Sequence, residues 1–490
     1  MIALSNRSFT ALPEGIEHPN YDRERLSAGI VHIGLGNFHR AHQSWYLHRL
    51  MQQGVAHDWA IVGAGVREYD KVMRSKLAKQ DYLTTLIELG PDSISAEIVG
   101  PMIDYLPVEE SNAALIRRIA CPDIRIVSLT VTEGGYYVDP VSGGFEGQHP
   151  DIVHDIQNPD APRTAFGAIV AALKLRLDDG LGPIALQSCD NLVGNGDVLR
   201  QTVVSLARLQ DPPLADWIDE NCSFPNSMVD CIVPSTGQRE LDLVQSLGLS
   251  DAAPVSHENF RQWVMEDDFC AGRPEWDRAG ATFSDNVHGF EMQKIRILNA
   301  GHQVLAGAAE IIGLHTISDA MEHDVLRSFF HVVMTDEVLP HVASVPGMSP
   351  ETYLQLVAKR FSNPTIADTV RRVAFDGSSR HPGFVLPSIR DALKKGAPFN
   401  GLALVEALWA RMCEGIREDG SEIAENDPLW LDLNTFAKQA RTEPKAWLGM
   451  KNIYGDIAEI SDFADTFEMW LRAIYNTGTE ATLRLYLEGN

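Results

Sequence analysis

Apolar residues in the first part of the chain form short runs that are separated by segments of helical spacing. The runs end in glycine or polar residues, as buried strands do, and occupy residues 30–36, 58–66, 82–89, 95–106, 124–132 and 182–191. The segments in which apolar residues recur every three or four positions occupy residues 39–54, 69–80, 109–120 and 164–177. Strands that alternate with helices predict βαβ units and a mainly parallel sheet, which is the α/β class.

The pattern changes near residue 280, and after it almost every apolar segment has helical spacing. These segments occupy residues 290–313, 323–342, 401–415 and 462–476. For a chain of 490 residues two domains are a reasonable expectation. We predict an α/β domain at residues 1–285 and a mostly α-helical domain at residues 286–490.

Charge argues against two classes of partner. The chain has 41 basic and 67 acidic residues, and the net charge of −26 is spread along its length. A nucleic-acid-binding protein needs a concentrated basic surface, and an anionic membrane repels so acidic a protein, so we expect neither partner. The N-terminus lacks the features of a signal peptide, and no apolar run reaches the ~18 residues of a membrane span. We expect a cytoplasmic protein, and we expect it to be a monomer.

The six cysteines lie far apart in the sequence and include no CxxC pair. This distribution is typical of a reduced compartment and offers none of the ligand spacings of a zinc site. We therefore expect no metal.

The sequence GLGNFHRAH (residues 34–42) follows the first predicted strand and opens the first predicted helix. Gly34 permits a tight turn, Gly36 lets the backbone approach a pyrophosphate, and the helix N-terminus supplies partial positive charge. These features predict a Rossmann-like dinucleotide-binding domain, although His39 stands where the third glycine of the fingerprint is usual. A glycine-rich turn without a ligand is the alternative interpretation.

An acidic residue near the end of the second strand should hold the ribose hydroxyls of the adenosine. Glu68 and Asp70 are available, and we select Glu68 because it lies closer to the strand end. A carboxylate there repels a 2′-phosphate, so we expect NAD rather than NADP, a preference that the neighbouring Arg67 would weaken.

The first long helix of the C-terminal domain carries polar residues among apolar ones. In KIRILNAGHQ (residues 294–303), Lys294, Asn299 and His302 fall within one half of the helix at about 100° per residue. An ammonium, an amide and an imidazole on one side of an apolar helix suit proton transfer and stabilisation of an oxyanion. A lysine that extends to the surface and a histidine satisfied in the core are the alternatives without function.

With this helix and the glycine turn in one chain, the sequence resembles the mannitol dehydrogenase family, the polyol-specific long-chain dehydrogenases. The resemblance covers nearly the whole chain. It rests on the motifs GLGNFHRAHQ (34–43), TVTEGGYY (130–137), SCDNLVGNG (188–196), FPNSMVD (224–230), QWVMEDDF (262–269), KIRILNAGH (294–302) and DGSSRHP (376–382). It implies a Rossmann-like N-terminal domain, a mostly helical C-terminal domain, and zinc-independent, NAD-linked oxidation of a sugar alcohol to a ketose.

Oxidation of a secondary alcohol requires one group that takes the hydroxyl proton and others that stabilise the alkoxide. Zinc dehydrogenases use the metal for both tasks, whereas a lysine whose pKa is lowered by burial takes the proton without a metal. The resemblance thus implies Lys294 as the general base, with Asn191 and Asn299 as amide donors to the alkoxide. His302 is expected to bind a substrate hydroxyl and to orient the lysine.

The other expected site residues have supporting roles. Glu291, one turn before Lys294, would pass the proton to solvent or, in the alternative without function, pair with the lysine. The residues expected to bind substrate hydroxyls are Asp230, Arg372 and Arg380. Their alternatives without function are an acid in a surface turn for Asp230 and surface ion pairs for the two arginines. The residues expected to bind the cofactor are Gly34, Gly36, Asn37, Phe38, Glu68 and Glu133.

Two departures from the family pattern bear on the substrate. Cys231 follows the triplet Met-Val-Asp, where family members often carry a basic residue, and Arg380 stands where they tend to have lysine. If these positions contact substrate hydroxyls, the preferred polyol differs from mannitol. The resemblance implies D-mannitol, oxidised to D-fructose, or a close polyol such as D-arabinitol. Two rival functions stay open: a sugar-acid oxidoreductase in which Arg372 and Arg380 bind a carboxylate, and an NAD-binding sensor without turnover.

Overall fold

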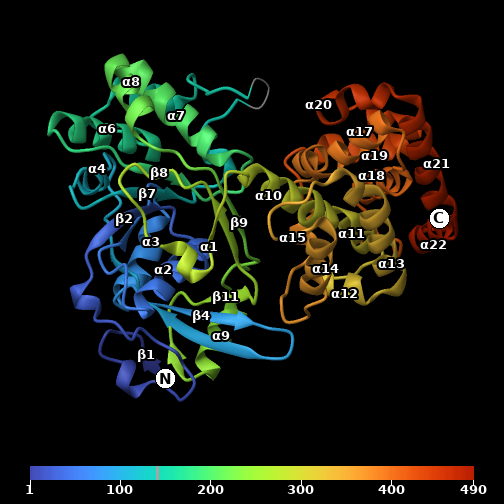
Figure 1. Cartoon of the computed structure of the whole chain (residues 1–490). Helices are drawn as coiled ribbons and strands as arrows, with labels where there is room; N and C mark the ends of the chain where they lie inside the picture. The colour runs from blue at the N-terminus through green and yellow to red at the C-terminus, as the bar shows by residue number, and fades with distance from the viewer. Residues whose placement is uncertain (140–142, 490) are drawn as a thin grey trace. The chain divides into compact units, whose positions relative to one another are not determined.

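The computed structural model of the chain describes residues 1–139 and 143–489 (Figure 1). This part of the chain forms two compact units, Met1–His288 and Gly289–Asn490, which we call the N-terminal and C-terminal units. The N-terminal unit combines strands with helices, whereas the described part of the C-terminal unit is built from helices. The expected combination of an α/β domain with a mostly helical domain is confirmed.

A parallel sheet of five strands forms the centre of the N-terminal unit. Its strand order is β6-β3-β2-β7-β8, and every neighbouring pair is parallel. The strands are β2 (Ala28–Ile33), β3 (Ala60–Ala64), β6 (Met102–Tyr105), β7 (Ile126–Leu129) and β8 (Ala185–Ser188). In order along the chain this is the 3-2-1-4-5 arrangement of a Rossmann fold, in which the direction of winding reverses between β2 and β7.

The other described strands form three smaller sheets, β11-β4-β5, β13-β12-β9 and β1-β10. Their bounds are β1 (Ile2–Ala3), β4 (Thr84–Leu89), β5 (Ile94–Val99), β9 (Ser227–Asp230), β10 (Leu249–Ser250), β11 (Val255–Glu258), β12 (Gln262–Met265) and β13 (Thr282–Phe283). The α-helices that begin in this unit are α1 (Asn37–Ala41), α2 (Gln43–Gln52), α3 (Asp70–Ala78), α4 (Ala113–Ile119), α5 (Pro150–Gln157), α6 (Ala165–Asp178), α7 (Asn195–Gln210), α8 (Pro212–Asn221), α9 (Gln238–Ser246) and α10 (Val287–Gln293). Short 3-10 helices are η1 (Phe9–Ala11), η2 (Arg23–Arg25), η3 (Glu133–Tyr136) and η4 (Trp276–Ala279).

Both faces of the five-stranded sheet are buried, which explains why its strands read as continuous apolar runs. Ile30 of β2 packs on one face with Leu47 of α2. Its neighbour Val31 points to the opposite face and packs with Phe166 of α6. Successive side chains of one strand therefore belong to two different cores.

The predicted strands and helices of the first 190 residues are present, with two breaks. The apolar run at residues 95–106 forms two strands, β5 and β6, which belong to different sheets. The helix expected at residues 39–54 is divided at His42, whose φ of −118° and ψ of −90° separate α1 from α2. No element is predicted for residues 192–285, where the structure has α7 to α9 and the strands β9 to β13. These strands have two to four residues each, too few to show an alternating pattern in the sequence.

Helices of several kinds build the C-terminal unit. Its α-helices are α11 (Ala300–Ile311), α12 (Ile317–Glu322), α13 (Asp324–Val332), α14 (Pro350–Phe361), α15 (Val370–Ala374), α16 (Gly377–Arg380), α17 (Leu386–Lys395), α18 (Asn400–Met412), α19 (Trp430–Ala440), α20 (Lys451–Tyr454), α21 (Ser461–Thr477) and α22 (Thr479–Gly489). Its π-helical turns are η5 (Lys294–Asn299), η6 (Val333–Val338) and η8 (His381–Val385), and its 3-10 helices are η7 (Leu339–His341), η9 (Pro444–Gly449) and η10 (Gly455–Glu459). None of the helices in the described ranges has the combined length and apolar character that a bilayer crossing needs.

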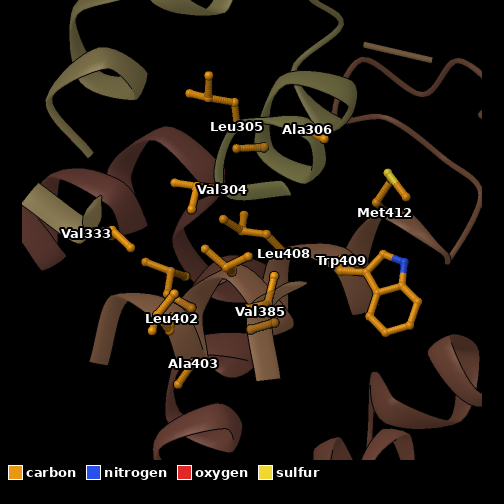
Figure 2. Close-up of a cluster of buried hydrophobic side chains, with 14 of the residues drawn as sticks. Val304, Leu305, Ala306, Val333, Val385, Leu402, Ala403, Leu408, Trp409 and Met412 are labelled. Carbon is orange, nitrogen blue, oxygen red and sulfur yellow. The ribbon is translucent and has the colours of Figure 1, made fainter. Parts of the chain in front are cut away.

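The core of this unit lies around α11 and α18, and Figure 2 shows part of it. Leu305 and Leu408 are fully or almost fully buried there. At Gly307 of α11, a Cβ atom would lie 3.2 Å from the backbone of Leu408, so glycine allows the two helices to approach closely. This core fixes α11, the helix that follows Lys294 and Asn299 in the chain.

Candidate active site

The turn after β2 brings its backbone against the end of the neighbouring strand β7. Gly34 has a φ of +93°, and a Cβ atom there would lie 2.2 Å from the carbonyl oxygen of Thr130. Glycine is therefore required at this position by both conformation and space. At Gly36 a Cβ atom would meet nothing within 4 Å. Protein packing does not require glycine there, and the open space suits a ligand that approaches the backbone.

His39 occupies the third fingerprint position, where glycine usually allows a helix to pack closely on a strand. Its buried ring stacks on that of His32 in β2, with the ring centroids 3.4 Å apart. Burial lowers the pKa of both histidines, that of His32 to about 3, so two uncharged rings fill the space between α1 and the sheet. Because α1 has only five residues, its dipole is also smaller than that of the longer helix predicted at residues 39–54.

Asn37 and Phe38, both expected to bind the cofactor, make contacts inside the protein. The side-chain amide of Asn37 donates to the hydroxyl of Thr236 (2.9 Å), and its oxygen accepts from the guanidinium of Arg40 (2.6 Å). The ring of Phe38 stacks on that of His42 with the centroids 4.8 Å apart. These side chains hold the turn in place, and their role in cofactor binding stays a prediction.

A cavity of about 370 Å³ opens beside the glycine turn. Its wall is formed by the turn after β2, the start of α3, the loop after β7 and the start of α6, and it includes Gly34, Gly36, Val66, Arg67, Tyr69, Asp70, Thr130, Thr132, Tyr137 and Phe166. The carboxyl group of Asp70 accepts a hydrogen bond from the backbone N–H of Arg67 (2.9 Å), and burial raises its pKa.

Glu68, the predicted ribose ligand, is not part of this wall. Its side chain is 83% exposed, and its carboxylate lies 2.8 Å from the ammonium group of Lys71. The structure brings Asp70 rather than Glu68 to the cavity, and the role of Glu68 stays a prediction.

Asp190, which is not among the predicted site residues, fixes the loop that follows β7. Its carboxylate accepts hydrogen bonds from the backbone N–H groups of Val131 (3.0 Å) and Thr132 (2.9 Å) and from the hydroxyl of Tyr136 (2.6 Å). Thr132 has a φ of +72°, a conformation that is costly for a β-branched residue and must be held by its surroundings. The sequence does place an acid at the end of a buried strand. A buried carboxylate needs hydrogen-bond donors around it, so this position could have indicated the role of Asp190.

Three further predicted residues lie in the N-terminal unit. Asn191 is exposed, three residues after the end of β8, the strand-end position at which α/β proteins bind ligands. Asp230 is the last residue of β9 and is buried. Glu133 begins η3, and its side chain lies outside what the structure describes. The roles assigned to these residues stay predictions.

The helix expected around Lys294 is present, but its middle turn is not α-helical. α10 continues into the π-helical turn η5 (Lys294–Asn299), which continues into α11. In a π turn hydrogen bonds join residues five apart, so Lys294 and Asn299 share one side more closely than the 100° spacing of an α-helix predicts. π turns within α-helices occur frequently at functional sites.

One side-chain donor on this helix is available to a ligand. The side-chain nitrogen Nδ2 of Asn299 is buried, and no hydrogen-bond acceptor contacts it in the described part of the chain. Leaving such a donor unsatisfied costs about 1–3 kcal/mol, which an incoming oxygen atom would recover. Lys294 is half-buried one π turn earlier, and Glu291 is buried in α10.

His302 lies in α11 beside Asp368, an acid that is not among the predicted site residues. Its Nε2 atom is 3.3 Å from Oδ2 of Asp368, and both side chains are buried. Arg372 bonds the other oxygen of Asp368, from Nε and from Nη2, both at 2.6 Å. The guanidinium of Arg380 donates to the carbonyl oxygen of Val373 (2.6 Å). The structure therefore brings His302 and Arg372 together through Asp368.

The candidate site offers an amine, an amide donor and a neutral imidazole. Burial lowers the pKa of His302, which keeps its ring uncharged at pH 7. Across residues 1–139 and 143–489, no cluster of three or more His, Cys, Asp or Glu residues is arranged to hold a metal ion. These groups suit proton exchange with a hydroxyl and stabilisation of an oxyanion.

Comparison with protein families accounts for both units. The model of the mannitol dehydrogenase Rossmann domain matches residues 28–278, and that of the mannitol dehydrogenase C-terminal domain matches residues 286–475. The chain belongs to the mannitol dehydrogenase family. The resemblance drawn from the sequence motifs is confirmed.

Members of the mannitol dehydrogenase family match this chain along its whole length. It is 51% identical over 476 residues to a mannitol 2-dehydrogenase of Cereibacter sphaeroides, an alignment that covers 97% of this chain and 100% of that one. A mannitol 2-dehydrogenase of Aspergillus terreus is 38% identical over 488 residues, or 98% of this chain and 97% of that one.

Two solved structures of this kind are similar over the full fold. The Pseudomonas fluorescens mannitol 2-dehydrogenase, in a ternary complex with NAD and D-mannitol, has a TM-score of 0.90 at 38% identity and covers 100% of both chains. A D-sorbitol dehydrogenase in substrate-free form has a TM-score of 0.90 at 33% identity, covering 98% of this chain and 100% of that one.

Proposed function

We propose that this chain is an NAD-dependent polyol dehydrogenase that oxidises D-mannitol, or a close relative of it, to the ketose. The observation that carries the proposal is the 51% identity, over nearly the whole of both chains, to a protein named mannitol 2-dehydrogenase. The Pseudomonas fluorescens relative, whose fold matches over the full length, is a complex with NAD and D-mannitol.

The N-terminal unit has features that fit NAD. The open space at Gly36 and the cavity beside it leave room for a dinucleotide along the turn after β2, at the point where the winding of the sheet reverses. Asp70 lines this cavity, and an acid there disfavours the 2′-phosphate of NADP. When bound, NAD supplies the hydride acceptor of the reaction.

The residues of the chain divide the remaining chemistry between them. Lys294 takes the proton of the hydroxyl group that is oxidised, and Glu291 passes that proton on to solvent. Asn191 and Asn299 donate hydrogen bonds to the alkoxide, a role supported by the unsatisfied Nδ2 atom of Asn299. His302 binds a further hydroxyl group, as Asp230 does, and no step requires a metal ion.

A polyol panel tests this proposal. The purified protein is incubated with NAD⁺ and, in separate assays, with D-mannitol, D-sorbitol, D-arabinitol and D-mannonate, and the absorbance of NADH is followed. We expect the highest kcat/KM with D-mannitol. Oxidation of D-mannonate alone would favour the sugar-acid function, and binding of NADH without turnover of any compound would favour a sensor.

The same assays test the absence of a metal from the mechanism. We expect activity to survive prolonged treatment with EDTA or phenanthroline, because the proposed base and oxyanion donors are side chains. Inactivation by the chelator that added Zn²⁺ reverses would contradict the lysine mechanism.

A further inference from the structure

The imidazole ring of His302 is confined within the C-terminal unit by an aromatic face and an acidic edge. Phe361 of α14 stacks on the ring, with the centroids 4.2 Å apart and the planes inclined by 21°. At the ring edge, Nε2 lies 3.3 Å from Oδ2 of Asp368. Neither of these two atoms has another hydrogen-bond partner in the described part of the chain. A small rotation of the ring therefore aligns an Nε2–H group with the carboxylate.

Asp368 is itself held in place by its backbone and by a cation. Its N–H donates to the carbonyl oxygen of Ile366 (2.8 Å), and its own carbonyl oxygen accepts from the N–H of Ile317 (2.9 Å). Arg372 binds Oδ1 through two nitrogen atoms, which leaves Oδ2 directed at His302. The direction of the carboxylate is thus set before any substrate arrives.

Charges around the pair keep the acid ionised and the ring neutral. Burial alone would raise the pKa of the Asp368 carboxyl group, but His302 and Arg372 outweigh it and the pKa is lowered. For His302 burial dominates and lowers the pKa, Asp368 opposes this effect, and Arg372 and Arg360 add to it. A carboxylate beside a neutral imidazole accepts the one ring N–H, so it selects the tautomer with the proton on the nearer nitrogen.

We propose that Asp368 is a positioning residue that keeps the proton of His302 on Nε2, so that Nδ1 offers a lone pair to a donating substrate hydroxyl. The proposal rests on the proposed polyol chemistry for the substrate contact. The arrangement of the two side chains does not depend on it. Arg372 then acts through Asp368, by holding the carboxylate in its charged form.

The tautomer is measured directly in the substrate-free protein by ¹⁵N NMR of ¹⁵N-histidine-labelled samples, with the His302 signals assigned from their loss in His302→Gln. We expect the Nε2–H tautomer in the wild type at pH 7. In Asp368→Asn the side-chain amide donates a hydrogen bond to Nε2, so the proton should move to Nδ1. A wild-type ring protonated on Nδ1, or an unchanged ring in a folded Asp368→Asn, would overturn the proposal.

Steady-state kinetics provide a second test of the role of Asp368. We expect Asp368→Asn to lower kcat/KM for the polyol about tenfold or more, because the wrong tautomer presents an N–H where a lone pair is needed. KM for NAD⁺ should not change, and Asp368→Glu, which keeps the charge, should recover part of the loss. Equal polyol kcat/KM in the wild type and in Asp368→Asn would also overturn the proposal.

Glu310→Gln is the matched control, because Glu310, which lies in α11, is another buried acid that pairs with an arginine, Arg417. This variant should lose stability without altering the His302 signals or the polyol kinetics. If the wild type oxidises no polyol, the proposed function fails, whereas the NMR result still decides whether Asp368 sets the tautomer.

Discussion

The glycine turn of the N-terminal unit and the Lys294 helix of the C-terminal unit use polar residues in opposite ways. In the turn, the side chains of Asn37 and Arg40 bond one another, and Asn37 also bonds Thr236. On the helix, Nδ2 of Asn299 has no acceptor among the described residues, and His302 has only the Asp368 carboxylate at its edge. Asn37 and Arg40 therefore stabilise the turn itself, whereas Nδ2 of Asn299 is left for a ligand to bind.

Two buried histidines show the same contrast. His39 stacks on a second neutral ring, His32, and fills the space between helix and sheet. His302 stacks on Phe361, but its edge meets an ionised acid. Burial lowers the pKa of both His39 and His302, so burial alone does not distinguish a packing histidine from a functional one. The group that lies at the edge of the ring distinguishes the two histidines.

The largest effect should come from the helix. Lys294→Ala should lower kcat/KM for polyol oxidation by about 10²- to 10⁴-fold, the usual contribution of general acid–base catalysis. In the wild type this parameter should rise with pH as the base loses its proton, and the variant should lose that ionisation. NADH binding, measured by fluorescence titration, should be unchanged. Near wild-type kcat/KM in the variant would mean that another group, with His302 the next candidate, takes the proton.

Removing an amide donor should have the next largest effect. Asn299→Ala should lower kcat by about 10²- to 10³-fold, because an oxyanion donor acts mainly in the transition state. Asn191→Ala should behave similarly, and neither variant should move the ionisation assigned to Lys294. The pH profiles of both variants, compared with that of the wild type, check this. A changed KM at constant kcat would show that the asparagines bind the substrate in its ground state instead.

Alanine substitutions at the two glycines of the turn should impair different properties, stability at Gly34 and cofactor binding at Gly36. Gly34→Ala forces a side chain into a positive φ and against Thr130, so we expect a loss of at least ~1–2 kcal/mol in the free energy of unfolding. The Cβ atom added in Gly36→Ala would contact no protein atom within 4 Å. The free energy of unfolding of this variant should therefore be unchanged, while its KM for NAD⁺ rises. Urea unfolding and cofactor kinetics on both variants separate these outcomes. Loss of stability in Gly36→Ala would place that residue in packing rather than in cofactor binding.

The smallest effect should be the change in cofactor preference when an acid near the cofactor cavity is replaced. Glu68→Lys should raise kcat/KM for NADP⁺ relative to NAD⁺, by about tenfold for each 1.4 kcal/mol of repulsion removed. Asp70→Asn is the matched comparison, because Asp70 lines the cavity and Glu68 does not. A shift in Asp70→Asn alone would transfer the role from Glu68 to Asp70. No shift in either variant would leave cofactor preference to other residues of the cavity.

The sequence predicted what local patterns encode. Apolar runs that end in glycine located β2 and the turn at Gly34, and helical spacing located the helix of Lys294. The roles of Asp190 and Asp368 were not predicted, because their partners lie far away in the chain. Asp190 accepts a hydrogen bond from Val131, and Asp368 faces His302. An isolated acid in a sequence has no pattern that reveals such a partner.

The π turn was not predicted from the sequence for another reason. Its residues, Lys294 to Asn299, have ordinary helix-forming side chains, and an assumed 100° per residue is adequate for an α-helix only. The choice between Glu68 and Asp70 likewise depended on where the chain turns after β3, which spacing alone does not fix. Outside residues 192–285 and the π turn, most element types followed from the sequence, whereas the orientation of individual side chains required the tertiary structure.

The π turn also limits how this helix tolerates changes of length. A π turn contains one residue more than the corresponding stretch of α-helix, because its hydrogen bonds span five residues instead of four. Deleting one residue between Lys294 and Asn299 would let an uninterrupted α-helix form, with α11 still seated in its core. Lys294 would keep nearly its direction relative to His302, because the π turn already accommodates one extra residue in the same rotation. Deleting a residue between Asn299 and His302 would instead turn the lysine by about 100° relative to His302. A family alignment should therefore place any gap in this helix within the π turn, since a deletion beyond it would misdirect the lysine.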